Sequence, residues 1–181
     1  AGNKEYDFVI NELGYNEENA KKTGFCRYDL LKDESKNSNK ILMMFTWRKQ
    51  FENDEKAFLD SKYYSTIQDL IKDTRLSDLL EKENLELYMC LHDKMIPYKD
   101  KFITTNSRIK IVDKTEKSIQ ELLRECKYLI TDYSSVAFDF AYMKKPLQYF
   151  QFDYEEFRKN HIPEGYWNYE DGFGEVTHTV D

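Results

Sequence analysis

Short apolar runs recur along the chain and predict the strands of a sheet. Five such runs lie at residues 41–46, 85–91, 109–112, 128–131 and 147–150. Each run is apolar at nearly every position, so it does not alternate between apolar and polar residues. Continuous apolar runs are typical of strands that are covered on both faces, as in a parallel sheet between helices. We therefore expect a five-stranded parallel sheet.

Helical patterns fill the intervals between these runs. In the first of them, Ile67, Leu70 and Ile71 fall on one face of a helix. We expect this helix to begin at Ser65, because Ser65 and Gln68 have the spacing of a capping box. In that motif a serine and the side chain three residues later satisfy each other's free backbone N–H groups.

Three further helices are expected. One covers residues 76–82, one begins at Ser118 with Glu121 in a second capping box, and one follows Ser134. Strands that alternate with helices indicate the α/β class, with a Rossmann-like, doubly wound parallel sheet. The length of 181 residues fits a single domain, so we expect residues 1–181 to form one.

Composition excludes several classes of protein. Hydrophobic residues make up 40% and charged residues 34%, which indicates a folded chain. The net charge of −7 argues against a broad nucleic-acid interface, and no apolar run approaches the ~20 residues of a membrane span. The three cysteines, Cys26, Cys90 and Cys126, show neither metal-ligand nor disulfide spacing. We expect free thiols, no metal and no cofactor.

Candidate functional residues follow the expected strands. In doubly wound sheets, ligands bind beyond the carboxyl ends of the strands. Thr46 and Arg48 follow the first strand, His92 follows the second, and Asp132 follows the fourth. His92 can donate a hydrogen bond to phosphoryl oxygens, and as an imidazolium it can offset negative charge. Arg48 would add a positive charge; the alternative is a surface arginine paired with an acid.

The segment after the fourth strand suits an anion. A helix that begins there presents free N–H groups, and Ser134 and Ser135 add two hydroxyls, which together suit a diphosphate. The alternative is structural: Ser134 caps the helix and Asp132 closes a turn. Asp139 is an acid inside an apolar helix, so it needs a partner if buried, either a ligand hydroxyl or a cation such as Lys144.

Four stretches, taken in order, resemble one known family. LITDYSSVAFDFAYMKKP at residues 129–146 carries most of the resemblance. TGFCRYD at residues 23–29, ILMMFTWR at residues 41–48 and the strand that ends in His92 match further motifs. Together they are similar to the CDP-glycerol:poly(glycerophosphate) glycerophosphotransferase family, which makes teichoic acids and related surface polymers and has a two-domain GT-B fold.

The chain departs from the pattern of that family at several positions. Cys26 and Phe45 stand where proline is usual, and Asp93 follows the histidine where proline is usual. Residues 164–166 read Glu-Gly-Tyr, where the family usually has an Arg-Gly pair before an aromatic residue. A carboxylate cannot replace a guanidinium at a phosphate. Either another cation, such as Arg158, takes its place, or the donor differs.

The resemblance implies a place for the chain within a larger enzyme. The chain would be the C-terminal, nucleotide-donor-binding half of a GT-B fold, with residues 1–35 as the linker segment and the N-terminal acceptor domain absent. The enzyme would transfer glycerol phosphate from CDP-glycerol to a growing polymer of the teichoic acid or capsule type. It would act in the cytoplasm at the inner face of the bacterial membrane. Peripheral membrane contact and binding of the polymer acceptor would belong to the full-length protein.

The resemblance also implies roles for particular residues. His92 would be catalytic and contact the donor diphosphate, while the catalytic base would be a histidine of the absent domain. We expect the donor to be bound by six further residues: Thr46, Arg48, Asp132, Ser134, Ser135 and Asp139. Arg27 and Asp29 are expected to hold the linker segment in place by an ion pair.

Two other interpretations stay open. A GT-B glycosyltransferase that uses a sugar nucleotide would need the same sheet and anion site, because a fold does not fix a function. A nucleotide-binding module without catalytic activity is also compatible with a chain that carries only the donor-binding half.

Overall fold

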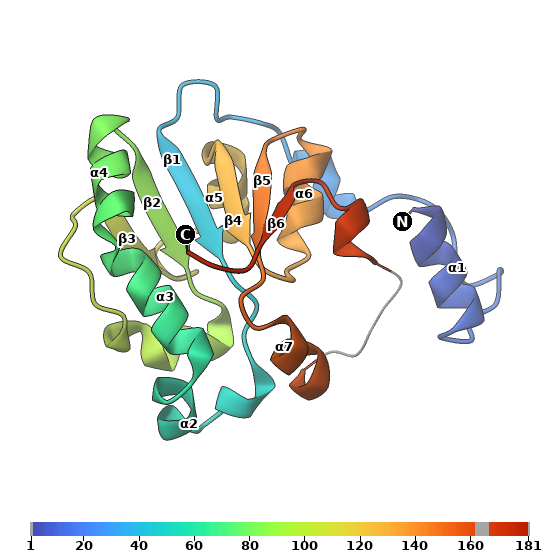
Figure 1. The fold of residues 1–181 in the computed structure, drawn as a ribbon. Helices are drawn as coiled ribbons and strands as arrows, with labels where there is room; N and C mark the ends of the chain where they lie inside the picture. Colours follow the sequence, from blue (N-terminus) through green and yellow to red (C-terminus); the bar gives the residue numbers. More distant parts are fainter. Residues whose placement is uncertain (1, 162–166, 181) are drawn as a thin grey trace.

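Six parallel strands form one sheet in the order β3-β2-β1-β4-β5-β6 in the computed structural model, which describes residues 2–161 and 167–180 (Figure 1). The strands are β1 (Lys40–Met44), β2 (Glu86–Cys90), β3 (Ile109–Val112), β4 (Tyr128–Thr131), β5 (Leu147–Phe150) and β6 (Glu175–Thr177). The five expected strands are confirmed. The sixth, β6, was not predicted, because it has three residues, two of them polar, and pairs only with β5 at the edge of the sheet.

Helices cover both faces of the sheet, as the doubly wound fold requires. They are α1 (Asn3–Asn11), α2 (Glu55–Leu59), α3 (Lys62–Lys72), α4 (Thr74–Lys82), α5 (Ile119–Glu125), α6 (Val136–Tyr142) and α7 (Tyr154–Asn160). Four 3-10 segments add to them: η1 (Cys26–Leu30), η2 (Lys49–Phe51), η3 (Asp93–Lys101) and η4 (Tyr169–Asp171). α3 and α4 lie on one face of the sheet, α5 and α6 lie on the other, and α7 lies beyond the carboxyl ends of the strands (Figure 1).

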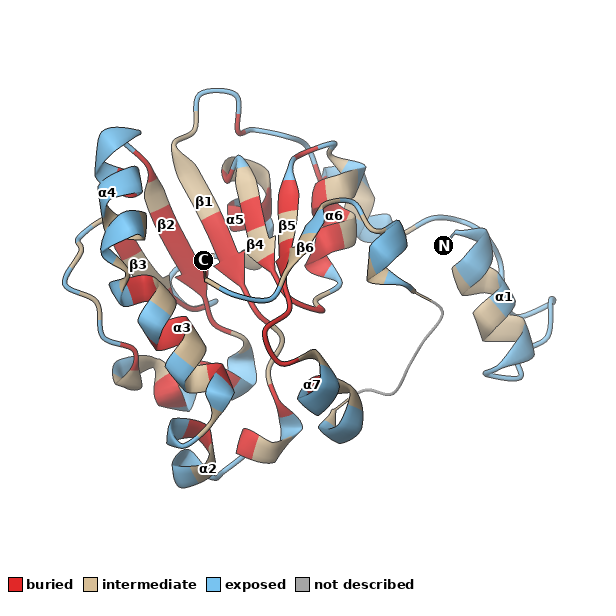
Figure 2. Ribbon diagram, viewed as in Figure 1, coloured by how far each residue is buried: buried red, intermediate tan, exposed pale blue. Residues whose placement is uncertain are grey.

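The alternation of side chains along the strands divides the core in two. Met43 packs with Ile67 and Leu80 beneath α3 and α4. Its neighbour Leu42 packs with Leu122 and Phe140, beneath α5 and α6. Successive residues of a strand point to opposite faces, so a strand inside two layers must be apolar at every position. The buried centre of the sheet in Figure 2 is therefore the reason that the apolar runs were continuous.

Two helix starts test the capping predictions. Ser118 caps α5, and the capping box with Glu121 is present as expected. The expected start of α3 at Ser65 is wrong: the helix begins one turn earlier, where the Ser61 hydroxyl accepts a hydrogen bond from the Tyr64 N–H at 3.1 Å. The earlier start places Tyr63, which is 4% exposed, against the core. Packing of this aromatic side chain outweighs the sequence signal at Ser65.

Among the residues described, no helix combines the length and the apolar character needed to cross a membrane. The three cysteines are free thiols, as expected. Cys26 is exposed, whereas Cys90 and Cys126 lie in the core. Burial raises the pKa of the Cys90 thiol to about 11 and that of Cys126 to about 12.

We predict that iodoacetamide at pH 8 modifies Cys26 alone in the folded chain. Alkylation requires an accessible thiolate. Cys90 and Cys126 are buried, so the reagent cannot reach them, and their raised pKa keeps them as thiols at pH 8. Mass spectrometry of peptides after brief labelling, with and without urea, measures this. Labelling of Cys90 or Cys126 at the rate of Cys26 without urea would contradict the packing described here.

Candidate functional site

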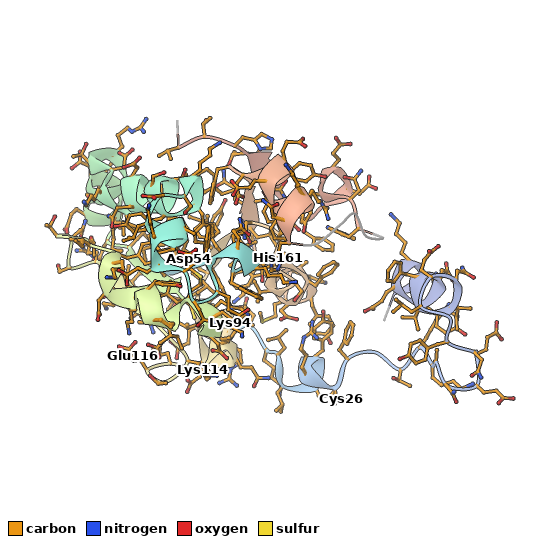
Figure 3. The ribbon with its side chains drawn as sticks, turned by 90° about the horizontal axis from the view of Figure 1, so that it is seen from below. Cys26, Asp54, Lys94, Lys114, Glu116 and His161 are labelled. Atoms are coloured by element: carbon orange, nitrogen blue, oxygen red, sulfur yellow. The ribbon has the colours of Figure 1, made fainter. Side chains whose placement is uncertain are left out.

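The carboxyl ends of three neighbouring strands bring the expected site residues to one edge of the sheet. In the parallel register Met43 lies beside Met89, and Met44 lies beside Thr131. The segments that follow these strands carry Thr46, His92 and Asp132, which therefore share this edge, as the sequence predicted. Figure 3 views the molecule from this side.

Arg48 has a different environment from the one expected. Its side chain has no exposed surface, and it lies between two carboxylates rather than open to a ligand. The guanidinium donates to Asp132 Oδ2 at 2.9 Å, to both carboxylate oxygens of Asp153 at 2.8 and 2.9 Å, and to the Thr46 carbonyl at 2.6 Å. Arg48 therefore connects the segments that follow β1, β4 and β5.

Asp132 and Thr46 complete the same internal network. Asp132 Oδ1 accepts hydrogen bonds from the Thr46 N–H at 2.8 Å, from the Thr46 hydroxyl at 2.9 Å and from the Tyr133 N–H at 2.6 Å. Asp132 is fully buried, so its carboxylate is engaged within the chain. The geometry gives Asp132 and Arg48 a positioning role, in which they fix the turn after β1.

Aromatic rings enclose the guanidinium. The Arg48 Cζ atom lies 4.8 Å from the ring centroid of Tyr63, 5.2 Å from that of Tyr133 and 4.7 Å from that of Phe157. Burial alone would lower the pKa of Arg48, but the attraction of Asp132 and the bonds to Asp153 outweigh it and raise the pKa. The guanidinium is therefore charged at any pH at which the chain folds, and its charge is offset inside the core.

Asp139 also has an internal partner. It is 6% exposed, and Oδ1 accepts a hydrogen bond from Arg27 Nε at 2.9 Å. This ion pair joins α6 to η1, and the ring of Tyr28 in η1 stacks on Tyr142 of α6 at 4.3 Å. Arg27 thus holds η1 against α6, and the expected ion pair with Asp29 is wrong, because the partner of Arg27 is Asp139.

His92 lies half-buried beside Trp47. Its ring is stacked on the indole, with 5.9 Å between centroids and 21° between planes, and Nδ1 accepts a hydrogen bond from the Lys94 N–H at 3.2 Å. Burial lowers the pKa of His92; Asp93 opposes this, and Lys94 and Lys114 lower the pKa further. His92 is therefore a neutral imidazole near pH 7, and its Nε2 carries the proton because Nδ1 is an acceptor.

A second histidine, His161, also contacts Trp47 and was not among the expected site residues. Its ring meets the indole edge-on at 5.0 Å, and its Nδ1 accepts from the Lys49 N–H at 3.1 Å. Burial lowers the pKa of His161, and the charge of Arg48 lowers it further. Asp132 acts in the opposite direction and raises the pKa, while His92 and Lys49 add smaller decreases. In the sequence, the only signal was a histidine at the start of an aromatic, acidic loop.

Ser134 and Ser135 precede α6 at the same edge. The Ser134 hydroxyl accepts from the Val136 N–H at 3.5 Å, the limit of a hydrogen bond. Ser135 stands at the N-cap position, but its side chain makes no capping bond, and it is exposed. Ser135 also lines a hollow of about 640 Å³, whose lining includes Arg27, Tyr28, Phe138, Tyr142 and Trp167.

Two further expectations concerned the Glu-Gly-Tyr segment and metal binding. The Glu-Gly-Tyr segment, Glu164 to Tyr166, lies outside the described residues. Within residues 2–161 and 167–180, no group of three or more His, Cys, Asp or Glu side chains is arranged to hold a metal ion.

We predict that Arg48→Met lowers the free energy of unfolding by about 3–5 kcal/mol, because it leaves two buried carboxylates without their cation. Urea denaturation followed by circular dichroism measures the change. Lys82→Met is the control: Lys82 is exposed and lies 3.6 Å from Glu83, and such a pair contributes less than about 1 kcal/mol. Equal losses in the two variants would show that Arg48 does not hold the strand ends together.

Comparison with known proteins places the chain in a family. It matches the family described as CDP-Glycerol:Poly(glycerophosphate) glycerophosphotransferase over residues 4–181. It is 34% identical over 184 residues to the minor teichoic acid biosynthesis protein GgaB of Bacillus subtilis (strain 168), a match that covers 95% of this chain and 20% of GgaB.

Solved structures of the wall teichoic acid polymerase TagF have the same fold. A TagF variant soaked with CDPG for 15 minutes aligns with a TM-score of 0.67 at 21% identity, over 98% of this chain and 44% of that one. A second variant aligns with a TM-score of 0.67 at 18% identity, over 99% of this chain and 45% of that one. The likeness identifies the all-parallel sheet with the C-terminal half of the GT-B fold of TagF.

The chain spans a fifth of the length of GgaB and less than half of TagF. The family match nevertheless extends from residue 4 to residue 181. The motifs at the carboxyl ends of β1, β2 and β4 lie within it, on the sheet that TagF shares. The chain belongs to the CDP-glycerol:poly(glycerophosphate) glycerophosphotransferase family.

Proposed function

We propose that this chain is the donor-binding half of an enzyme that transfers glycerol phosphate from CDP-glycerol to a growing surface polymer. The observation that carries the proposal is the family match over residues 4–181. The fold shared with TagF, whose variant was soaked with CDPG, supports the choice of donor. The polymer would be of the teichoic acid or capsule type, and the enzyme would act at the cytoplasmic face of the membrane.

The reaction in this proposal is a phosphoryl substitution. A hydroxyl oxygen of the polymer end attacks the phosphorus that bears the glycerol, and a new P–O bond forms. The bond from that phosphorus to the bridging oxygen breaks, and CMP leaves with that oxygen. The hydroxyl proton passes to a base, which we assign to the acceptor domain outside this chain. Catalysis of such a transfer depends on positioning and on stabilising charge at the phosphoryl oxygens.

The exposed donors of the site fit this requirement. His92 would donate its Nε2–H to a phosphoryl oxygen, because its Nδ1 already accepts the Lys94 N–H. Ser134 and Ser135 would contribute hydroxyls from the turn before α6. The buried residues, Arg48 and Asp132, would act indirectly, by fixing the turn that carries Trp47 beside His92.

The remaining expected ligands have supporting positions. Thr46 would not contact the donor through its hydroxyl, because that hydroxyl donates a hydrogen bond to Asp132. Asp139 would stabilise the linker segment through Arg27. In this proposal both residues influence the donor through the backbone that they hold.

We predict that His92→Ala and the double variant Ser134→Ala, Ser135→Ala each weaken CDP-glycerol binding by about ten- to a hundredfold, the effect of losing a hydrogen bond to a charged group. Titration calorimetry on the full chain measures the affinity. His178→Ala is the control, because His178 follows β6 at the far edge of the sheet and its Nδ1 contacts the Gln151 carbonyl at 2.8 Å.

Two results would count against the proposal. Binding of CDP-glycerol by both site variants as tightly as by the parent chain would place the donor elsewhere. Tighter binding of a UDP-sugar than of CDP-glycerol by the parent chain would instead indicate a glycosyltransferase.

A pH titration tests the protonation state of His92. Its surroundings are Asp93, Lys94, Lys114 and the Trp47 ring, and its pKa is lowered, so the neutral form prevails above pH 6.5. CDP-glycerol, a diphosphate diester, has no ionisation near neutral pH. We therefore predict that calorimetric affinity changes by less than about twofold between pH 7 and 8.5. A steady loss of affinity over this interval would mean that binding requires an imidazolium.

A further inference from the structure

Trp47 contacts two imidazoles that come from distant parts of the sequence. His92 follows β2 and stacks on the indole at 5.9 Å, whereas His161 follows α7 and meets the indole at 5.0 Å. Because both rings contact the same indole, both lie at one place on the edge of the sheet. Both rings are half-buried at the edge that carries the carboxyl ends of the strands.

The two histidines are fixed in the same tautomer. In each, Nδ1 accepts a backbone N–H: from Lys94 in His92 at 3.2 Å, and from Lys49 in His161 at 3.1 Å. An Nδ1 that accepts a hydrogen bond cannot carry the proton, so in each neutral ring Nε2 is the donor. One site therefore presents two N–H donors whose rings are held by the backbone.

His161 has rigid support on its other side. Its ring stacks on Phe157 at 5.1 Å, and Phe157 in turn stacks on Tyr133 at 3.9 Å and lies over the Arg48 guanidinium. The Asp153 carboxylate, at the N-cap position of α7, binds Arg48 instead of capping the helix. The position of α7, and with it that of His161, is thus set by the buried network.

The surroundings of His161 suit an anion. The exposed Lys49 adjoins it, and the Lys94 ammonium, which is paired with Glu52, lies 5.7 Å from the centroid of the Trp47 ring. Figure 3, seen from the carboxyl edge, labels His161 and Lys94, and both residues contact the ring of Trp47.

We propose that His161 is a second donor to the diphosphate of the nucleotide, acting through Nε2–H together with His92, with both rings held against Trp47. The inference rests on the proposed function, because the diphosphate is that of the nucleotide donor. It adds a binding residue from α7, a part of the chain that the expected site did not include.

Two substitutions separate donation from packing. In His161→Gln the amide oxygen can accept the Lys49 N–H and the amide nitrogen can donate, whereas His161→Phe keeps a flat ring against Trp47 and Phe157 but has no donor. We expect His161→Phe to weaken CDP-glycerol binding by about ten- to a hundredfold in calorimetry, and His161→Gln to restore most of the affinity. His178→Phe is the matched control and should bind as the parent chain does.

The fluorescence of Trp47 gives a readout that a purely structural role would not change. In a Trp167→Phe background Trp47 is the single tryptophan, and CDP-glycerol that bonds both flanking imidazoles should alter its emission. We expect this change in the His161→Gln variant and its reduction in the His161→Phe variant at saturating nucleotide.

The outcomes distinguish this inference from the proposed function. If His92→Ala weakens binding while His161→Phe binds as tightly as the parent chain, the role of His161 is overturned and the proposed function stands. If His161→Phe and His161→Gln lose affinity equally while both unfold at the parent's urea midpoint, donation by Nε2–H is overturned. If the parent chain does not bind CDP-glycerol, both proposals fall.

Discussion

The buried guanidinium of Arg48 is the interaction on which the rest of the site depends. It bonds two carboxylates that follow β4 and β5 while it is itself carried by the segment after β1. One cation between two anions leaves an excess negative charge in the core, which is costly unless hydrogen bonds surround it. The Thr46 hydroxyl, the Tyr133 hydroxyl and backbone N–H groups supply those bonds. Leaving any of these buried groups without its hydrogen bond would cost free energy, so the network is stable only when all its bonds form together. It therefore aligns the segments that follow β1, β4 and β5.

This network explains why the expected ligands divide into two groups. Arg48, Asp132 and Asp139 are charged residues that the sequence placed at the ligand edge, and the structure finds all three buried and paired within the chain. The groups that remain exposed or half-buried there include the uncharged donors His92, Ser134 and Ser135 and the exposed cation Lys49. The buried ion pairs hold the strand ends in place, and these hydrogen-bond donors lie at the edge above them.

The sequence predicted the sheet well and the site only in part, for physical reasons that particular residues show. Burial on both faces makes strands continuously apolar, so β1 to β5 were evident. β6 is held by backbone bonds to β5 and has no comparable pattern. The sequence could not predict that Arg48 is buried between two carboxylates, because its partner Asp153 lies 105 residues further along the chain. His161 depends in the same way on the Lys49 N–H, 112 residues distant.

The proposed function implies an electrostatic difficulty, because a protein with a net charge of −7 would repel a diphosphate at long range. Hydrogen bonds act only over about 3 Å, so they cannot offset that repulsion until the ligand is in place. Their donors must then already point at the phosphoryl oxygens, since any reorganisation would cost binding energy. The chain meets this condition by bonding Nδ1 of His92 and of His161 to the backbone and by bracing the second ring through Phe157 on Arg48. In the proposed site, the paired charges buried beneath the edge thus fix the positions of the imidazole donors before the ligand arrives.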